Sequence, residues 1–162
     1  MDIFDETILE FWRACEKAGL KYIIIGGFAT NLNGYQRATE DVDIYIKDSS
    51  DNRRALREAF KYAEMGDFEP LERLEFVPGW TYFHLNNGFR LDVMTSLKGL
   101  ENISFDQCYA EAFEAEIHGL RIPFLHINHL IKSKKAANRP KDQLDVIYLE
   151  KIKNLLKDQN KL

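Results

Sequence analysis

The chain has 162 residues, of which 45% are hydrophobic, and a formal net charge of −4. This length is sufficient for one domain with a substantial core. The negative charge argues against broad binding to a nucleic-acid backbone, which requires a basic surface, and favours a small or locally bound substrate. No apolar run approaches the roughly 18 residues of a membrane span, and the acidic N-terminus is unlike a signal peptide. We therefore expect a cytoplasmic protein without a membrane partner.

We expect a single domain over residues 1–157 and a frayed tail over residues 158–162. The two cysteines, Cys15 and Cys108, show neither CxxC nor Cys/His spacing. Free, buried thiols are therefore expected in place of a disulfide or a zinc site.

The first elements are predicted from apolar spacing. Residues 3–18 have the pattern of an amphipathic helix, and residues 22–25 that of a strand covered on both faces. Gly26 and Gly27 then turn the chain into a short helix over residues 28–32. In isolation such a glycine pair is more often a plain connection. Alternatively, its side-chain-free backbone lets N–H groups approach phosphate oxygens.

The next strand, which ends at Ile46, begins with two acidic residues. Because side chains alternate along a strand, Asp41 and Asp43 share one face, and Val42 points to the other. Their Cα atoms are about 6.6 Å apart, so both carboxylates could bind the same metal ions. Arg37 and Thr39 precede this strand. They are either part of a solvated loop or a means of offsetting the carboxylates and contacting a phosphate.

A charged amphipathic helix is predicted over residues 50–65. Strands are predicted over residues 74–77, 81–85 and 89–94, the last two joined by a turn containing Asn87 and Gly88. In the last strand Asp92 shares a face with Arg90. It can join the other carboxylates only if this strand lies beside theirs, which the sequence does not establish. Alone, such an aspartate is more often solvated.

The C-terminal part is predicted to contain a hairpin and two helices. A loop and short helix over residues 97–110 precede strands over 112–117 and 120–124, and the helices span 125–137 and 140–156. The four histidines lack ligand spacing and are treated as packing or surface residues. The basic cluster here is most simply a solvated face; it comprises Lys132, Lys134, Lys135, Arg139 and Lys141.

The glycine pair, the Arg-x-Thr and the Asp-x-Asp resemble the nucleotidyltransferase superfamily, which includes DNA polymerase beta and kanamycin nucleotidyltransferase. The resemblance is clearest over residues 22–46 and weaker over 89–94 and 125–149. The tail with Lys135, Asp142 and Asp145 is similar to that of small bacterial nucleotidyltransferase-like proteins, some related to toxin or abortive-infection components. The resemblance implies an α/β (α+β) fold with a mixed sheet flanked by helices and a C-terminal helical pair.

The resemblance also implies a function. Asp41, Asp43 and Asp92 would hold Mg²⁺ or Mn²⁺, and Asp92 would alternatively act as a base. Gly26 and Gly27 would cradle the triphosphate, with Arg37, Thr39 and Lys135 as further nucleotide contacts. A nucleoside monophosphate would move from a nucleoside triphosphate to a hydroxyl of an unknown small-molecule, protein or RNA acceptor.

Two features qualify this expectation. A Gly-Gly-Phe replaces the Gly-Ser common among active transferases, and no large second domain is present for an acceptor. One alternative is a non-catalytic nucleotide-binding or toxin-antitoxin interaction module, with an antitoxin or a second copy as partner. Another is a metal-dependent phosphoester hydrolase that uses the same carboxylates.

Overall fold

The computed structural model describes residue 2 and residues 5–162. Its centre is a six-stranded mixed sheet with the strand order β3-β4-β2-β1-β6-β5. The strands are β1 (Tyr22–Ile24), β2 (Asp41–Ile46), β3 (Trp80–His84), β4 (Arg90–Met94), β5 (Phe113–Ile117) and β6 (Leu120–Phe124). β2 runs parallel to β4, whereas β1–β2, β3–β4 and β5–β6 are antiparallel pairs. The predicted mixed α/β fold is confirmed.

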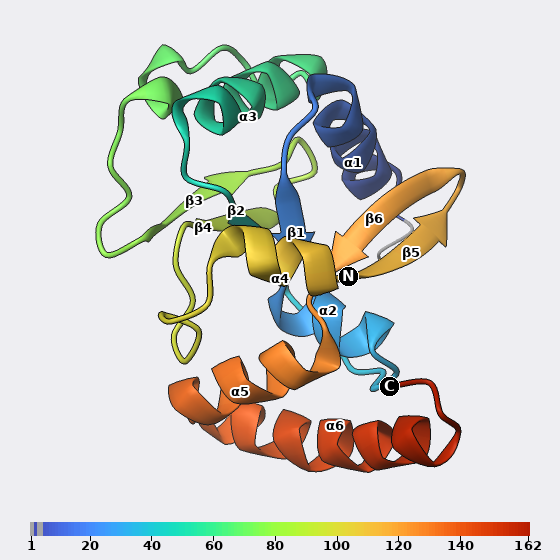
Figure 1. The fold of residues 1–162 in the computed structure, drawn as a ribbon. Helices are drawn as coiled ribbons and strands as arrows, with labels where there is room; N and C mark the ends of the chain where they lie inside the picture. Colours follow the sequence, from blue (N-terminus) through green and yellow to red (C-terminus); the bar gives the residue numbers. More distant parts are fainter. Residues whose placement is uncertain (1, 3–4) are drawn as a thin grey trace.

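The helices lie on both sides of this sheet (Figure 1). They are α1 (Glu6–Ala18), α2 (Gly26–Leu32), α3 (Ser50–Tyr62), α4 (Phe105–Glu111), α5 (Ile127–Ala137) and α6 (Pro140–Asp158). α1 and α3 lie together on one side, and the α5–α6 pair lies on the other, beyond α2. Residues 3–4, where the first helix was expected to begin, fall outside the described residues.

Local signals account for the ends of α1. The Asp5 side chain accepts a hydrogen bond from the Thr7 amide at 3.0 Å, which caps the N-terminus. Gly19 ends the helix in the left-handed conformation at φ 68°. Between these ends Trp12 is buried and stacks on Tyr22 of β1, with ring centroids 5.4 Å apart. The amphipathic pattern of the sequence thus fixes α1 against the sheet.

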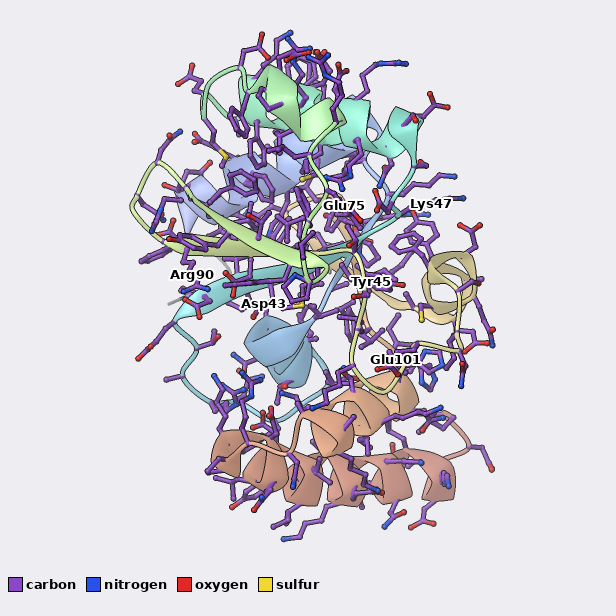
Figure 2. All side chains as sticks on the ribbon, turned by 90° about the vertical axis from the view of Figure 1, so that its left-hand side faces the viewer. Asp43, Tyr45, Lys47, Glu75, Arg90 and Glu101 are labelled. Atoms are coloured by element: carbon purple, nitrogen blue, oxygen red, sulfur yellow. The ribbon has the colours of Figure 1, made fainter. Side chains whose placement is uncertain are left out.

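The two faces of the β2–β4 region have different chemistry. On one face Phe83 of β3 meets Phe60 of α3, with centroids 4.9 Å apart, within the apolar core. The other face carries the acidic residues of β2 and β4. Arg90 and Asp43 lie on this second side of the sheet, toward α2 and the α5–α6 pair (Figure 2). The alternation of residues in β2 and β4 therefore separates the core from a polar surface.

The strand predicted over residues 74–77 is wrong. The segment follows a short 3₁₀ helix, Glu69–Glu72, and the Leu74 amide donates to the carbonyl of Pro70 at 2.8 Å. Phe76 alone packs inward, beneath the Arg53 guanidinium at 3.9 Å from its ring centroid. Leu74 and Val77 remain exposed, so the apolar run has no neighbouring strand to pair with.

Other predicted elements shift only at their ends. α2 begins at Gly26, two residues before the predicted start, and α3 ends at Tyr62. Cys15 and Cys108 are free and buried, as predicted. Within residues 2 and 5–162 no helix has the length and apolar character needed to span a bilayer.

Candidate active site

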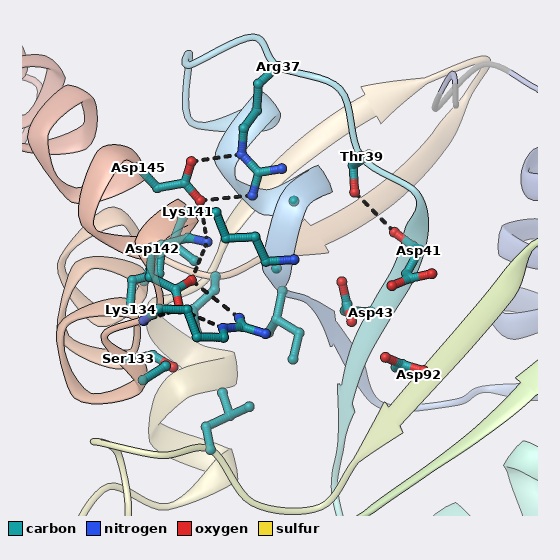
Figure 3. Close-up of a pocket in the computed structure, with 18 of the residues that line it drawn as sticks. Arg37, Thr39, Asp41, Asp43, Asp92, Ser133, Lys134, Lys141, Asp142 and Asp145 are labelled. Carbon is teal, nitrogen blue, oxygen red and sulfur yellow. Dashed lines mark hydrogen bonds and ion pairs between the residues drawn. The ribbon is translucent and has the colours of Figure 1, made fainter.

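A cleft of about 610 Å³ lies between the polar face of the sheet and the α5–α6 pair. One wall comes from the β1–α2 turn, β2 and β4, and the other from α5 and α6. Figure 3 shows the carboxylates of Asp41, Asp43 and Asp92 gathered at the first wall, opposite basic side chains of the second. The size is within the range of small-molecule sites, about 300–1,000 Å³.

Strand register brings the three carboxylates together. Asp43 is directly opposite Asp92 in the parallel β2–β4 pair, and Asp41 is opposite Arg90. The adjacency on which the prediction for Asp92 depended is therefore present. The Thr39 hydroxyl donates to the backbone carbonyl of Asp41 at 3.3 Å. No described residue forms a hydrogen bond or ion pair with the carboxylate of Asp41 or Asp43. Asp92 differs, because the Arg90 Nε donates to its Oδ1 at 2.6 Å.

The crowded carboxylates alter the acidity of Asp43. Burial, followed by the charges of Asp92 and Asp41, raises the pKa of Asp43 to about 7, and Lys141 and Lys134 oppose this shift only in part. A large fraction of Asp43 is therefore protonated at neutral pH in the metal-free protein. The site has too little positive charge for its carboxylates.

The glycine turn packs directly on this cluster. Gly26 has φ +64°, and a Cβ atom there would collide with the carboxylate of Asp43. A Cβ atom on Gly27 would collide with the hydroxyl of Thr39. Both glycines line the cleft, as do Thr39 and Arg37. Glycine is thus required here for close approach as well as for the turn.

Buried ion pairs organise the opposite wall. Asp145, with 1% of its side chain exposed, accepts from Arg37 through Nε at 2.7 Å and Nη2 at 2.8 Å. Lys134 Nζ lies 2.7 Å from the same carboxylate and 3.7 Å from Asp142. Arg139 Nε donates to Asp142 at 2.7 Å. Together these contacts connect the loop before β2 to both C-terminal helices.

The ion pairs keep both aspartates charged despite their burial. Burial acts to raise the pKa of Asp145, but hydrogen bonds from Arg37 and Lys134 outweigh it and the pKa is lowered. The pKa of Asp142 is lowered in the same way, with Arg139 outweighing burial. Arg37 therefore supports the wall, whereas Lys141 reaches into the cleft (Figure 3) and has no described partner.

Of the predicted site residues, Lys135 alone lies outside the cleft. Its Nζ pairs with Glu150 at 2.8 Å, and 59% of its side chain is exposed. The preceding residue, Lys134, is buried and lines the cleft. The helical face of Ile127, Leu130 and Ile131 includes Lys134 at i+3 and i+4 spacing, so helix periodicity could have identified it.

The donor set suits a hard divalent cation. Mg²⁺ and Mn²⁺ prefer carboxylate oxygens, and Mg²⁺ usually takes one or two carboxylates together with water and substrate phosphates. Asp41 and Asp43 offer two carboxylates without other partners. The described ranges contain no group of three or more His, Cys, Asp or Glu side chains arranged to hold one ion. Two carboxylates would leave the remaining positions of such an ion for water or other ligands.

Three solved structures share the fold. TM1012 of Thermotoga maritima, described as a nucleotidyltransferase, matches with TM-score 0.56 and 15% identity over 97% of this chain and 92% of that chain. The lincosamide antibiotic adenylyltransferase LnuA, lincomycin-bound, matches with TM-score 0.63 and 15% identity over 94% and 99%. ANT(2")-Ia in complex with adenylyl-2"-tobramycin gives TM-score 0.51 and 19% identity over 93% and 92%.

Sequence comparison supplies the family. No curated protein matches the chain. A family profile described as "Nucleotidyltransferase of unknown function (DUF6036)" matches residues 5–158, nearly the full length. The chain therefore belongs to this nucleotidyltransferase family.

Proposed function

We propose that the cleft binds a nucleoside triphosphate with Mg²⁺ or Mn²⁺ and transfers its nucleotidyl group to an acceptor hydroxyl. The observation that carries this proposal is the meeting of Asp41, Asp43 and Asp92 at one wall, where the carboxylates of Asp41 and Asp43 have no described partner. The volume of the cleft, about 610 Å³, and the basic side chains of its opposite wall support the proposal further.

Asp41 and Asp43 would hold the metal ions. Bound there, a divalent ion would neutralise charge that develops on the phosphate oxygens. Asp92 would hold an ion or act as the base. Its ion pair with Arg90 already fixes the carboxylate in position at the edge of the cluster.

The triphosphate would lie along the β1–α2 turn. The first N–H groups of a helix have no acceptor within it, and Gly26 and Gly27 present theirs without side chains. Lys141 takes the role first assigned to Lys135, because it projects into the cleft and has no described carboxylate partner. The nucleobase would occupy the apolar part of the cleft, whose lining includes Ile25, Met94, Leu97, Leu125 and Leu130.

The reaction is an exchange of one phosphorus–oxygen bond for another. The acceptor oxygen attacks the α-phosphorus, and the bond from that phosphorus to the bridging oxygen of the β-phosphate breaks. The proton passes to Asp92, and pyrophosphate leaves. LnuA, an adenylyltransferase, and ANT(2")-Ia with its adenylyl-tobramycin support ATP as the first nucleotide to test.

Calorimetry with ATP and Mn²⁺ tests binding. The wild type should bind ATP only when the metal is present. The double variant Asp41→Asn/Asp43→Asn should lose this metal-dependent binding. Lys141→Ala should weaken ATP binding at least about tenfold through loss of a charge-assisted contact, and Lys135→Ala should not. Equal binding by the double variant and wild type would refute the metal assignment.

Product analysis separates the alternatives. Pyrophosphate with a labelled acceptor supports transfer, whereas inorganic phosphate from a phosphoester indicates hydrolysis. Metal-dependent ATP binding with no turnover on any acceptor would favour a non-catalytic nucleotide-binding module.

A further inference from the structure

The exposed edge of the sheet carries a strip of aromatic rings that the cleft does not use. Trp80, Tyr82 and His84 alternate along β3, and their side chains are exposed. The Trp80 and Tyr82 ring centroids are 5.9 Å apart, and those of Tyr82 and His84 are 5.8 Å apart. β3 is the terminal strand of the sheet, and Trp80 and Tyr82 are 36% and 49% exposed.

The aromatic strip continues the acidic wall of the cleft. Tyr82 is directly opposite Asp92 in the β3–β4 register, and Asp92 is directly opposite Asp43. Directly opposed residues of neighbouring strands are separated by only about 5 Å. A molecule resting on Tyr82 would therefore place its nearest groups beside the carboxylate proposed to accept the proton.

Arg90 joins the rings to the carboxylate. Its guanidinium lies 4.5 Å from the Tyr82 ring centroid and 5.2 Å from that of Trp80. Its Nε is held by Asp92 at 2.6 Å. No described residue hydrogen-bonds to Nη1 or Nη2, and 38% of the side chain is exposed. The guanidinium thus lies over the Tyr82 ring and is held by Asp92 through Nε, with the donors at Nη1 and Nη2 available.

This combination has a specific chemistry. Exposed aromatic rings stack on nucleobases, and an arginine fork binds phosphate oxygens through two parallel hydrogen bonds. A cationic acceptor such as an amino sugar would be repelled by the positive charge of Arg90. An acceptor that carries a planar ring, a phosphate and a hydroxyl satisfies all three features at once.

We propose that Trp80, Tyr82 and Arg90 form the acceptor site, and that the acceptor is a nucleoside phosphate with a free hydroxyl. This inference rests on the proposed function. The base would stack on Trp80 and on the exposed part of Tyr82 that Arg90 does not cover. The phosphate would bind Arg90, and the hydroxyl would lie at Asp92. Attack on the α-phosphorus of the triphosphate then forms a phosphodiester, transfers the hydroxyl proton to Asp92 and releases pyrophosphate.

Two sources share this chemistry: a free nucleotide and the 3′ end of a short single strand. The experiment incubates the full chain with Mg²⁺ and ATP labelled at the α-phosphate. One arm contains nucleoside monophosphates, and the other a five-residue oligoribonucleotide. An oligoribonucleotide without terminal hydroxyls and an amino sugar serve as comparison acceptors. Labelling in either arm that requires the hydroxyl supports the inference and identifies the source.

Variants connect labelling to the strip. Tyr82→Ala should lower kcat/KM for the acceptor at least about fivefold through loss of stacking, with ATP affinity unchanged within about twofold. Tyr82→Phe retains the ring and should behave like the wild type. Tyr62→Ala is the matched control, since Tyr62 is exposed and contacts Lys17 at 4.1 Å but lies on α3. Melting temperatures check that each variant is folded.

Binding of a fluorescent oligoribonucleotide and of monophosphate competitors is also measured without ATP. Absence of both acceptor binding and labelling, with metal-dependent ATP binding intact, would overturn the inference and leave the proposed function standing. Equal kcat/KM for Tyr82→Ala and wild type, or labelling of the amino sugar alone, would also overturn it. Absence of ATP binding would instead refute the proposed function.

Discussion

Asp43 should destabilise the metal-free protein, and Asp43→Asn should relieve this cost. The pKa of Asp43 rises from 3.8 to about 7, mainly through burial and then through Asp92 and Asp41. A shift of about 3 units corresponds to a ceiling of about 4 kcal/mol at 1.36 kcal/mol per unit. Because the side chain is only partly buried, we expect a gain of about 1–2 kcal/mol.

The sign of the pH dependence follows from proton linkage. A raised pKa means that the folded state binds more protons than the unfolded state between about pH 4 and pH 7. Below about pH 4 Asp43 is protonated in both states and does not lower the stability of the fold. Its destabilising effect develops as the pH rises to 7. The difference between Asp43→Asn and wild type should be near zero at pH 4, should grow to pH 7, and should then remain constant.

Thermal unfolding in chelator at pH 4, 5.5, 7 and 8 measures this difference. The expected gain corresponds to about 2–8 °C in Tm at neutral pH for a protein of this size. Asp158→Asn is the matched control, since Asp158 is exposed at the end of α6 and should change stability by less than about 0.5 kcal/mol. A lower Tm for Asp43→Asn at pH 7 would show that the carboxylate is a structural hydrogen-bond acceptor.

Three further predictions concern the cleft walls. Lys134→Met should lower the free energy of unfolding by about 2–4 kcal/mol in urea titrations, because buried carboxylates lose a counter-ion, whereas Lys135→Met should cost less than about 0.5 kcal/mol. Gly26→Ala should lower Tm more than Gly19→Ala. The two glycines have similar φ, +64° and +68°, but only a Cβ at Gly26 would collide with a carboxylate, that of Asp43. Equal decreases in Tm would show that the effect comes from φ alone. The pKa of Asp145 is lowered, so its charged form stabilises the fold at neutral pH and this stabilisation is lost on acidification. Asp145→Asn should therefore have a lower Tm than the wild type at pH 7, and the difference in Tm should narrow in melts at acid pH.

Local patterns predicted the acidic wall correctly, and pairing across the chain completed it. Alternation in β2 requires only neighbouring residues, so Asp41 and Asp43 could be placed on one face from sequence. The position of Asp92 depended on β2 lying beside β4, a parallel pairing that no local signal specifies. The bidentate pair of Arg37 and Asp145 joins residues 108 positions apart and was likewise beyond local reasoning.

The errors have local causes. The segment over residues 74–77 has strand-like composition, but composition does not supply a pairing partner, and the amide of Leu74 instead continues the preceding 3₁₀ turn. The similarity of the tail points to Lys135, whereas the structure places Lys134 in the lining of the cleft. One residue of a helix corresponds to a rotation of about 100°, which is enough to exchange a buried cleft position for a solvent-exposed ion pair with Glu150.

Most of the basic side chains that line the cleft are already paired, whereas the carboxylates of Asp41 and Asp43 are not, and this difference bears on which ligands fit the site. Lys134, Arg37 and Arg139 line the cleft, but the buried carboxylates of Asp142 and Asp145 already engage them. These cations hold the helical wall in place and are not free to neutralise the opposite one. Lys141 is a described cleft cation without a carboxylate partner, and in the proposed function metal ions would supply the remaining positive charge. In the proposed function, a ligand that brings both metal ions and phosphates would supply cations to the acidic wall and an anion for Lys141, which a neutral ligand of the same size would not.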